Sequence, residues 1–387
     1  MQTYMNRNYV LGTATLAAAF LLGGGAANAS PPPADVVASC MTRAAAVLGF
    51  NGSMYARLGD VTMEKFFGAS DAAGQIPIVS RTQFNIASAG KMFTAVAIGL
   101  LVDRGAVQFD APISRYLPDL EAAGAITVAQ LLNHTSGLGD YFNPANRAAI
   151  DAAATATHLL PLALGGAHEF TPGSKRAYSN SGFVVLGAII EKVSGLTYAQ
   201  FVQKEILTPL GMFNTRLDAK QGAQAMTRMS PEGPLEKTRP APVQAHASPA
   251  GGMFSTPSDQ SLFLTALTHG SLLKRETVST LLVARADPGG GSGVYGYGFN
   301  VREQVPRRVG HGGGAPGANA EVALYPDSGR QLIALSNNDP PAASRMVTVL
   351  EKVIFAADPE ESCATALADP GLHAPISQVH PPVSRKR

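Results

Sequence analysis

One stretch dominates the hydrophobic pattern of this chain: residues 92–102 contain no charged side chain. Their apolar members fall on every side of a helical wheel, and a helix that is apolar all round is a buried one. Lys91 immediately precedes the stretch. The pattern therefore predicts a single cation at the head of a core helix, where an ammonium is costly unless it is paired or loses its proton.

Shorter segments on both sides of this helix predict a mixed fold. Apolar spacing and short apolar runs predict helices at residues 35–47, 148–163, 182–193, 198–206 and 342–356, and strands at residues 50–57, 61–68, 295–301, 308–310, 318–325 and 331–337. Strands near both chain ends, with helices between them, indicate one sheet built from the two ends. The fold class is therefore α/β with a helical insert.

The same pattern divides the chain into parts. An α/β part is expected at about residues 30–110 and 255–365, and a mostly helical part at about residues 111–254. Within the helical part, residues 221–243 are polar, contain prolines and show no period, so we expect a long loop there. Residues 366–387 are rich in proline and end in three basic residues, which predicts a disordered tail.

The N-terminus has the pattern of a signal peptide at residues 1–29. Arg7 precedes an apolar segment at residues 9–22, and Ala27-Asn28-Ala29 supplies a small-x-small cleavage site. The alternative is an uncleaved anchor, but glycines end the apolar segment short of the ~20 residues that a span needs. We therefore expect export to the periplasm or the medium, with no stable membrane span after cleavage.

Composition narrows the class of partner. The chain has 387 residues, 45% of them hydrophobic, which is enough for a large core. Its net charge is +2, and charges of both signs are scattered along it, without the basic stripe expected of a nucleic-acid-binding protein. We expect no nucleic-acid partner.

Cys40 and Cys363 are the two cysteines, and they lie near opposite ends of the expected folded region. Export would place them in an oxidising compartment, where a disulfide can persist. They could pair if the first and last helices lie side by side; the alternative is two buried free thiols. Two cysteines alone do not make a zinc site.

Ser88 and Lys91 are the first candidates for chemistry. Residues three apart on a helix share a face. A hydroxyl beside a desolvated amine is an activated nucleophile, because burial lowers the amine pKa and the amine then accepts the serine proton. The alternative is Ser88 as a helix cap and Lys91 as a surface residue, and the short Ser-x-x-Lys pattern alone does not decide between them.

Tyr178-Ser179-Asn180 is the second candidate, in a loop ahead of the helix expected at residues 182–193. A nearby ammonium is expected to lower the pKa of Tyr178 below its usual value of about 10. The phenol would then shuttle a proton between a serine and a leaving group. Asn180 offers a donor and an acceptor to a substrate carbonyl or amide. The alternative is an ordinary loop tyrosine followed by a capping serine.

His311-Gly312-Gly313-Gly314 is the third candidate, on or beside the late strands. Glycines there let a substrate backbone approach closely, and their N–H groups could complete an oxyanion hole with that of Ser88. His311 could hold a substrate carboxylate or relay a proton. The alternative is a flexible hairpin turn.

Taken in order, the three motifs resemble those of the serine β-lactamase and penicillin-binding-protein superfamily, whose Ser-x-x-Lys signature is well defined. The chain is most similar to the branch that uses Tyr-x-Asn: class C β-lactamases, D-alanyl-D-alanine carboxypeptidases and family VIII carboxylesterases. The resemblance spans residues 35–357. It includes four further stretches, at residues 131–138, 178–195, 208–212 and 249–253.

The resemblance implies an antiparallel sheet flanked by helices, a mostly helical part, and a cleft between them. It implies that Ser88 is the acylated nucleophile and that Lys91 and Tyr178 share the general-base and general-acid roles. It also implies that Asn180 orients the substrate and that the N–H groups of Ser88 and Gly314 form the oxyanion hole. No metal or organic cofactor is implied, and the partner would be a small-molecule or peptide substrate. His134 would be structural.

The third motif departs from the Lys-Thr-Gly that is typical of β-lactamases. A neutral histidine attracts a carboxylate far less than an ammonium does, and Gly312 has no hydroxyl to donate. Efficient β-lactamase activity is therefore not expected from this motif. The leading hypothesis is an exported serine hydrolase of amide or ester bonds, acting on D-amino-acid peptides, small esters or β-lactams. The alternative is a receptor or scaffold protein of the same fold that does not turn over.

Overall fold

The computed structural model describes residues 31–71, 73–119, 126–166, 168–218, 247–285, 287–289 and 294–372. The expected signal peptide, the expected loop at residues 221–243 and the last part of the expected tail lie outside the described residues.

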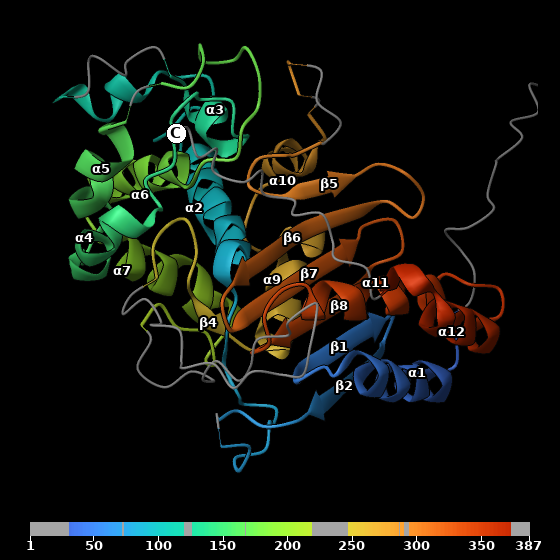
Figure 1. Ribbon diagram of the computed structural model, residues 1–387. Helices are drawn as coiled ribbons and strands as arrows, with labels where there is room; N and C mark the ends of the chain where they lie inside the picture. The colour runs from blue at the N-terminus through green and yellow to red at the C-terminus, as the bar shows by residue number, and fades with distance from the viewer. Residues whose placement is uncertain are drawn as a thin grey trace, which may run out of the picture.

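A six-stranded antiparallel sheet forms the centre of the α/β part (Figure 1). Its strands are β1 (Gly52–Leu58), β2 (Val61–Phe67), β5 (Asn300–Arg302), β6 (Arg308–Ala315), β7 (Ala318–Tyr325) and β8 (Arg330–Ser336), in the order β2-β1-β8-β7-β6-β5. Because β1 pairs with β8 along its length, the two ends of the chain meet in one sheet, which confirms the expected antiparallel α/β architecture.

Three helices from the two chain ends cover one face of this sheet: α1 (Ala34–Leu48), α11 (Ala342–Ile354) and α12 (Pro359–Ala368). Gly49 ends α1 in the left-handed conformation that a glycine adopts without strain (φ +59°). The first and last helices do lie side by side, and Cys40 of α1 and Cys363 of α12 form a disulfide with their Cα atoms 6.0 Å apart.

The other face of the sheet packs against α2 (Lys91–Asp103) and α9 (Pro257–His269), and α10 (Arg275–Leu282) packs against α2. Helix α2 lies between the sheet and the helical part, which is built from α3 (Val128–Leu132), α4 (Arg147–Ala152), α5 (Ala156–Leu164), α6 (Asn180–Ser194), α7 (Tyr198–Val202) and α8 (Thr208–Leu210) (Figure 1). A short pairing of β3 (Phe84–Asn85) with β4 (Phe254–Ser255) ties the segment before α2 to the end of the helical part.

Several predicted boundaries were wrong. The helix expected at residues 148–163 is two helices, because the chain is extended at Ala153 and Thr155 begins α5 as its N-cap. Helices α9 and α10 were not predicted. The disorder expected from residue 366 is also incorrect for the first part of the tail: α12 continues to Ala368, and Leu372 is buried in the apolar cluster that includes residues of α1 and α11.

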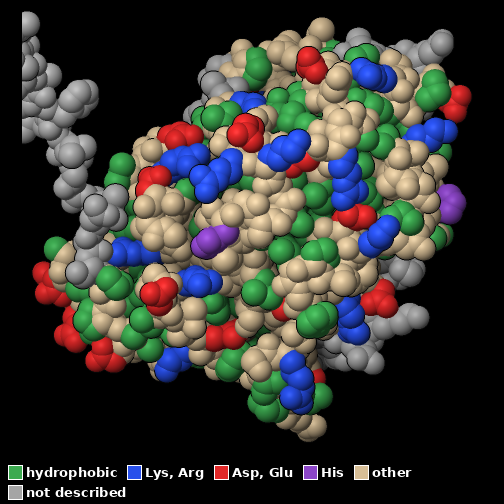
Figure 2. All heavy atoms as spheres, turned by 180° about the vertical axis from the view of Figure 1, so that it is seen from behind, with side chains coloured by type: hydrophobic (Ala, Val, Ile, Leu, Met, Phe, Trp, Pro, Cys, Tyr) green, Lys and Arg blue, Asp and Glu red, His purple; other side chains and the backbone are tan. Residues whose placement is uncertain are grey.

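Among the described helices, none taken singly is long and apolar enough to cross a membrane; Asn180–Ser194 and Tyr198–Leu210 pass that test only as a pair bent by 74°. On the face seen in Figure 2, basic and acidic side chains lie interspersed. The surface pattern there follows the mixed charge pattern of the sequence.

Candidate active site

Ser88 lies on a short 3-10 turn, Ala87–Gly90, that leads directly into α2. The preceding residue, Ala87, has a positive φ of 44°, which is uncommon for a residue with a Cβ. Two hydrogen bonds hold it there: its N–H donates to Asn85 Oδ1 (2.8 Å), and its carbonyl accepts from the Gly252 N–H (3.1 Å). Such strain persists where the surroundings determine the conformation, and it is typical of functional sites.

Two glycines let other parts of the chain close tightly around this turn. A Cβ on Gly313 of β6 would lie 2.1 Å from the carbonyl oxygen of Ile86, and one on Gly251 would lie 2.2 Å from that of Ala87. Both would also lie 3.1 Å from the backbone nitrogen of Ser88. Glycine is therefore needed at both positions, and β6 brings the backbone of Gly313 beside the Ser88 N–H. The oxyanion hole of the Ser88 and Gly314 N–H groups stays a prediction.

Lys91 is fully buried, and its Nζ contacts three oxygens: Ser88 Oγ at 3.2 Å, Asn180 Oδ1 at 2.7 Å and Ala250 O at 2.6 Å. No carboxylate is among them, so burial dominates and lowers the pKa of Lys91 to about 7, while Asp140 raises it in part. A neutral amine has two N–H donors and one lone pair. Because Asn180 Oδ1 and Ala250 O can only accept, the lone pair of neutral Lys91 is directed at the Ser88 hydroxyl.

Tyr178 completes the group around the serine. Its Oη donates a hydrogen bond to Ser88 Oγ at 2.8 Å, and Lys91 Nζ lies 4.8 Å from the centre of its ring. The pKa of Tyr178 is raised rather than lowered, because burial disfavours the phenolate more strongly than the hydrogen bond to Ser88 favours it. The sequence-based expectation of a lowered pKa was wrong. Near neutral pH this tyrosine is a phenol that can donate a proton.

Asn180, at the first turn of α6, links the lysine to a carboxylate. Its Nδ2 donates to Asp140 Oδ2 at 2.8 Å, so its Oδ1 faces Lys91. Ser179 caps the same helix by accepting from the Gly182 N–H. Asp140 thus fixes the orientation of the amide that accepts from Lys91. The sequence-based reasoning missed Asp140, which follows the 131–138 stretch by two residues and shows no pattern of its own.

Hydrogen bonds also fix the segment that contains Ala250, whose carbonyl oxygen accepts from Lys91. Thr94 Oγ1 donates to the carbonyl of Pro249 at 2.6 Å, and Tyr198 Oη lies 2.8 Å from Thr94 Oγ1. These contacts fix the peptide that precedes Ala250, whose carbonyl oxygen accepts from Lys91. The 249–253 stretch belongs to the site for this reason, a role that the sequence pattern did not reveal.

His134 lies beneath this group. It is buried, has a φ of +64°, and its Nδ1 accepts from the Ser179 N–H at 3.2 Å. Its ring packs against Tyr178 with centres 4.4 Å apart. Burial, and then the charge of Lys91, keep the pKa of His134 well below its ordinary value. A neutral ring that supports the Tyr178 segment matches the structural role expected for it.

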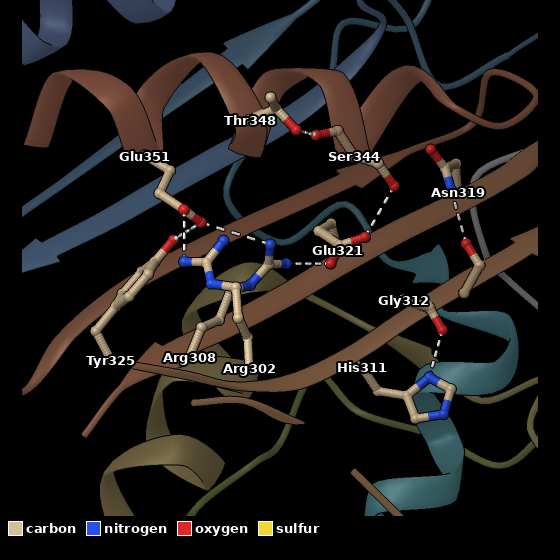
Figure 3. A network of polar contacts seen from close by, with 11 residues as sticks. Arg302, Arg308, His311, Gly312, Asn319, Glu321, Tyr325, Ser344, Thr348 and Glu351 are labelled. Carbon is tan, nitrogen blue, oxygen red and sulfur yellow. Dashed lines mark hydrogen bonds and ion pairs between the residues drawn. The ribbon is translucent and has the colours of Figure 1, made fainter. Parts of the chain in front are cut away.

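His311 lies on β6, not on a flexible turn, and its side chain points to the same side of the strand as Gly313. It is buried, with Nε2 2.8 Å from Tyr295 Oη. Its Nδ1 lies against the Gly312 carbonyl (Figure 3). Both ring nitrogens therefore already have partners within the protein. This arrangement does not favour the carboxylate-holding role that the sequence suggested.

The opposite face of β6 carries a largely buried group of charges beneath α11 (Figure 3). Arg308 forms ion pairs with Glu321 and with Glu351 (3.5 Å), and Arg302 pairs with Glu351 at 2.6 Å. Tyr325 Oη donates to Glu351 at 2.7 Å. Burial alone would lower the pKa of Arg308, but the charge of Glu321 and of its other acidic neighbours raises it by more. The net shift is upward, so the guanidinium stays charged.

The structure brings Ser88, Lys91, Tyr178 and Asn180 into one hydrogen-bonded group and places Gly313 against it. Within the described residues, no three His, Cys, Asp or Glu side chains are arranged to hold a metal ion. The group can do acid–base and nucleophilic chemistry with protein side chains alone: a hydroxyl, an amine that is neutral above about pH 7, and a phenol.

The chain is similar to a known protein family and to several of its characterised members. A family model described as Beta-lactamase matches residues 52–352. Penicillin-binding protein 4* of Bacillus subtilis (strain 168) is 30% identical over 319 residues, which are 75% of this chain and 68% of that protein. Esterase EstB of Burkholderia gladioli is 26% identical over 293 residues, 72% of this chain and 70% of that protein.

The solved structure of D-amino acid amidase from Ochrobactrum anthropi SV3, complexed with L-phenylalanine amide, has the same fold. It matches with a TM-score of 0.69 at 26% identity, over 86% of this chain and 98% of that chain. The match to the family model and the identity to the penicillin-binding protein span most of the described residues. The chain therefore belongs to the β-lactamase family, among the serine hydrolases related to penicillin-binding proteins.

Proposed function

We propose that this protein is an exported hydrolase that cleaves amide or ester bonds through an acyl-enzyme formed on Ser88. The observation that carries the proposal is the arrangement around Lys91. Two neutral acceptors take its N–H groups, its pKa is about 7, and its third position faces the Ser88 hydroxyl. An amine that is neutral at working pH and aimed at a hydroxyl is a general base for nucleophilic catalysis.

The first half of the reaction forms the acyl-enzyme. Lys91 Nζ takes the Ser88 proton as Oγ bonds to the substrate carbonyl carbon, and the carbonyl electron pair moves onto oxygen. The N–H groups of Ser88 and Gly314 stabilise that oxyanion. As the bond to the leaving nitrogen or oxygen breaks, Tyr178 and the Lys91 ammonium together deliver the proton taken from Ser88, so the leaving group departs as a neutral amine or alcohol.

The second half reverses these roles with water. The same basic groups take a proton as water bonds to the acyl carbon, and Ser88 Oγ regains a proton as its bond to that carbon breaks. Tyr178 suits the role of proton donor because its raised pKa keeps it protonated at neutral pH. The enzyme is thereby returned to its starting state.

Relatives support hydrolysis but differ in what they act on. Their names include a penicillin-binding protein, an esterase and a D-amino acid amidase. We propose the periplasm or the medium as the site of action, supported by the signal-like N-terminus and by the disulfide between Cys40 and Cys363. No nucleic-acid partner is proposed.

The test is intact-mass measurement after exposure to acylating probes, together with a rate panel of a chromogenic cephalosporin, a short-chain nitrophenyl ester and a D-alanyl-D-alanine peptide. Transient acylation of Ser88 with product release supports the proposal. A permanent adduct supports the alternative of a receptor that is acylated without turnover. The absence of any adduct and any turnover would support a binding scaffold and reject the proposal.

A further inference from the structure

Asp140 lies beside the catalytic group, but the proposed acyl-transfer steps give it no role. It is exposed, while the group that it contacts is buried: its Oδ2 accepts from Asn180 Nδ2, and its Oδ1 accepts from the Phe142 N–H at 2.9 Å. Its charge acts on the catalytic group, because it raises the pKa of both Lys91 and Tyr178. Asp140 is thus an anion at the open side of the site.

Within the part of the chain that the structure describes, no basic side chain forms an ion pair with Asp140. The ion pairs found there join other residues, and none includes Asp140. The two hydrogen bonds it accepts hold the carboxylate in place and leave lone pairs on both oxygens, since an ionised carboxylate has about four acceptor sites.

The other side of the site offers little to a substrate carboxylate. His311 stands where a lysine would attract one, and its ring nitrogens are engaged by Tyr295 and the Gly312 carbonyl. The guanidinium of Arg176, two residues before Tyr178, donates to the Arg285 carbonyl at 3.3 Å. Lys91 has a pKa of about 7, so it is not a permanent cation. The charge pattern therefore opposes an anionic substrate group and favours a cationic one.

We propose that Asp140 binds the free α-ammonium of amino-acyl amides or esters, so that the enzyme releases the amine or alcohol from substrates with an unblocked amino terminus. A chain of hydrogen bonds joins Asp140 to the nucleophile. Asn180 bridges Lys91, which contacts Ser88, to Asp140, so the carboxylate lies one amide group beyond the catalytic amine. In an amino-acyl group the α-nitrogen is two bonds from the carbonyl carbon that Ser88 attacks. The inference rests on the proposed function.

The experiment compares alanine p-nitroanilides, in both the D and L forms, at pH 7. The α-amino group is free, N-acetylated or N-succinylated, which makes the substrate cationic, neutral or anionic without changing the leaving group. For the better enantiomer we expect kcat/KM to fall at least tenfold from free to acetylated and further for succinylated. A wild-type enzyme that prefers either blocked substrate would overturn the inference.

Substitutions then assign the preference to Asp140. In Asp140→Asn the ratio of kcat/KM for free to acetylated substrate should fall at least tenfold, and in Asp140→Glu it should stay within about threefold of wild type. The ratio cancels both the intrinsic reactivity of the two substrates and any general loss of activity through Asn180. Asp60→Asn, an exposed carboxylate in the β1–β2 turn, is the matched control and should leave the ratio unchanged.

Binding gives a second readout that needs no turnover. Calorimetry on Ser88→Ala protein should show tighter binding of alanine anilide than of its N-acetyl form, and adding Asp140→Asn should remove the difference. Equal binding, or a difference that survives Asp140→Asn, would reject the ammonium site. The two proposals fail differently: if wild type hydrolyses p-nitrophenyl acetate through Ser88 but shows no ammonium preference, only this inference is lost. If no probe is hydrolysed through Ser88, the proposed function is lost.

Discussion

Arg308 and Lys91 lie on opposite sides of β6, and their pKa values are shifted in opposite directions. Arg308 lies among carboxylates and is paired with Glu321 and Glu351, so its pKa rises and its charge is permanent. Lys91, more deeply buried, contacts only neutral oxygens, and its pKa falls to about 7. Burial alone therefore does not make a general base. What matters is the absence of a contacting carboxylate and the presence of neutral acceptors that keep the amine in place.

The largest effect is expected from removing the Ser88 hydroxyl, from which Lys91 is proposed to take a proton. Ser88→Ala should reduce turnover of any substrate by at least about 10³-fold, because it removes the hydroxyl that Lys91 Nζ contacts. The melting temperature should change little, since Ser88 contributes only its hydroxyl contacts with Lys91 and Tyr178. Activity within a few-fold of wild type would show that the nucleophile lies elsewhere.

Lys91→Arg tests whether the cation must lose its proton. A guanidinium stays protonated under all assay conditions, so this substitution gives Lys91 the permanent charge of Arg308. We expect a loss of kcat/KM close to that of Lys91→Ala, on the order of 10³-fold. The double variant Ser88→Ala with Lys91→Ala should be no worse than either single variant, because the two residues act as one unit. Substantial activity in Lys91→Arg would contradict the general-base role.

Arg308→Met examines the other cation. Removing the guanidinium leaves Glu321 without its ion-pair partner in a largely buried position, which should cost roughly 3 kcal/mol of unfolding free energy. Lys91→Met should cost less, since a wild-type lysine near its pKa already bears the cost of burial. Urea unfolding of both variants gives the comparison. A larger loss of stability in Lys91→Met would mean that the amine is held as a structural charge.

The pH dependence of kcat/KM reports the pKa of Lys91. With an uncharged nitrophenyl ester, kcat/KM should rise about tenfold per pH unit up to about pH 7 and then level off, because the neutral amine is the active form. Asp140 raises the pKa of Lys91, so Asp140→Asn should move this limb to lower pH. A profile that falls as pH rises through 7 would show that the ammonium is the active form.

Much of this arrangement was predictable from local pattern. The charge-free run after Lys91 predicted a buried helix headed by a cation, and both features are present. The strands at the two chain ends predicted a single sheet, and β1 does pair with β8. In these cases one segment carries the whole signal, because periodicity reports which faces of an element are buried.

The errors arose where several segments act together. Tyr178 was expected to have a lowered pKa because only the nearby ammonium was considered, whereas its burial is produced by residues far away in the sequence. Asp140 carries no local pattern, and its importance comes from its contact with Asn180, 40 residues later. The start of the disordered tail was placed at residue 366, within the last turn of α12, although Leu372 is still buried against the core.

The smallest effect on activity is expected from the contacts that hold the Ala250 segment, whose carbonyl accepts from Lys91. Tyr198→Phe removes the hydroxyl that contacts Thr94, which in turn holds the Pro249 carbonyl beside Ala250. A neutral buried hydrogen bond contributes about 1 kcal/mol, so we expect kcat/KM to fall by roughly two- to fivefold and stability to fall slightly. Tyr116→Phe is a matched control, because it removes a buried hydroxyl that accepts from the Gln108 N–H at 2.8 Å and has no contact with Lys91. If both variants lose stability but only Tyr198→Phe loses activity, the neutral acceptors are part of what makes Lys91 a base; equal losses of activity would show that the effect is general.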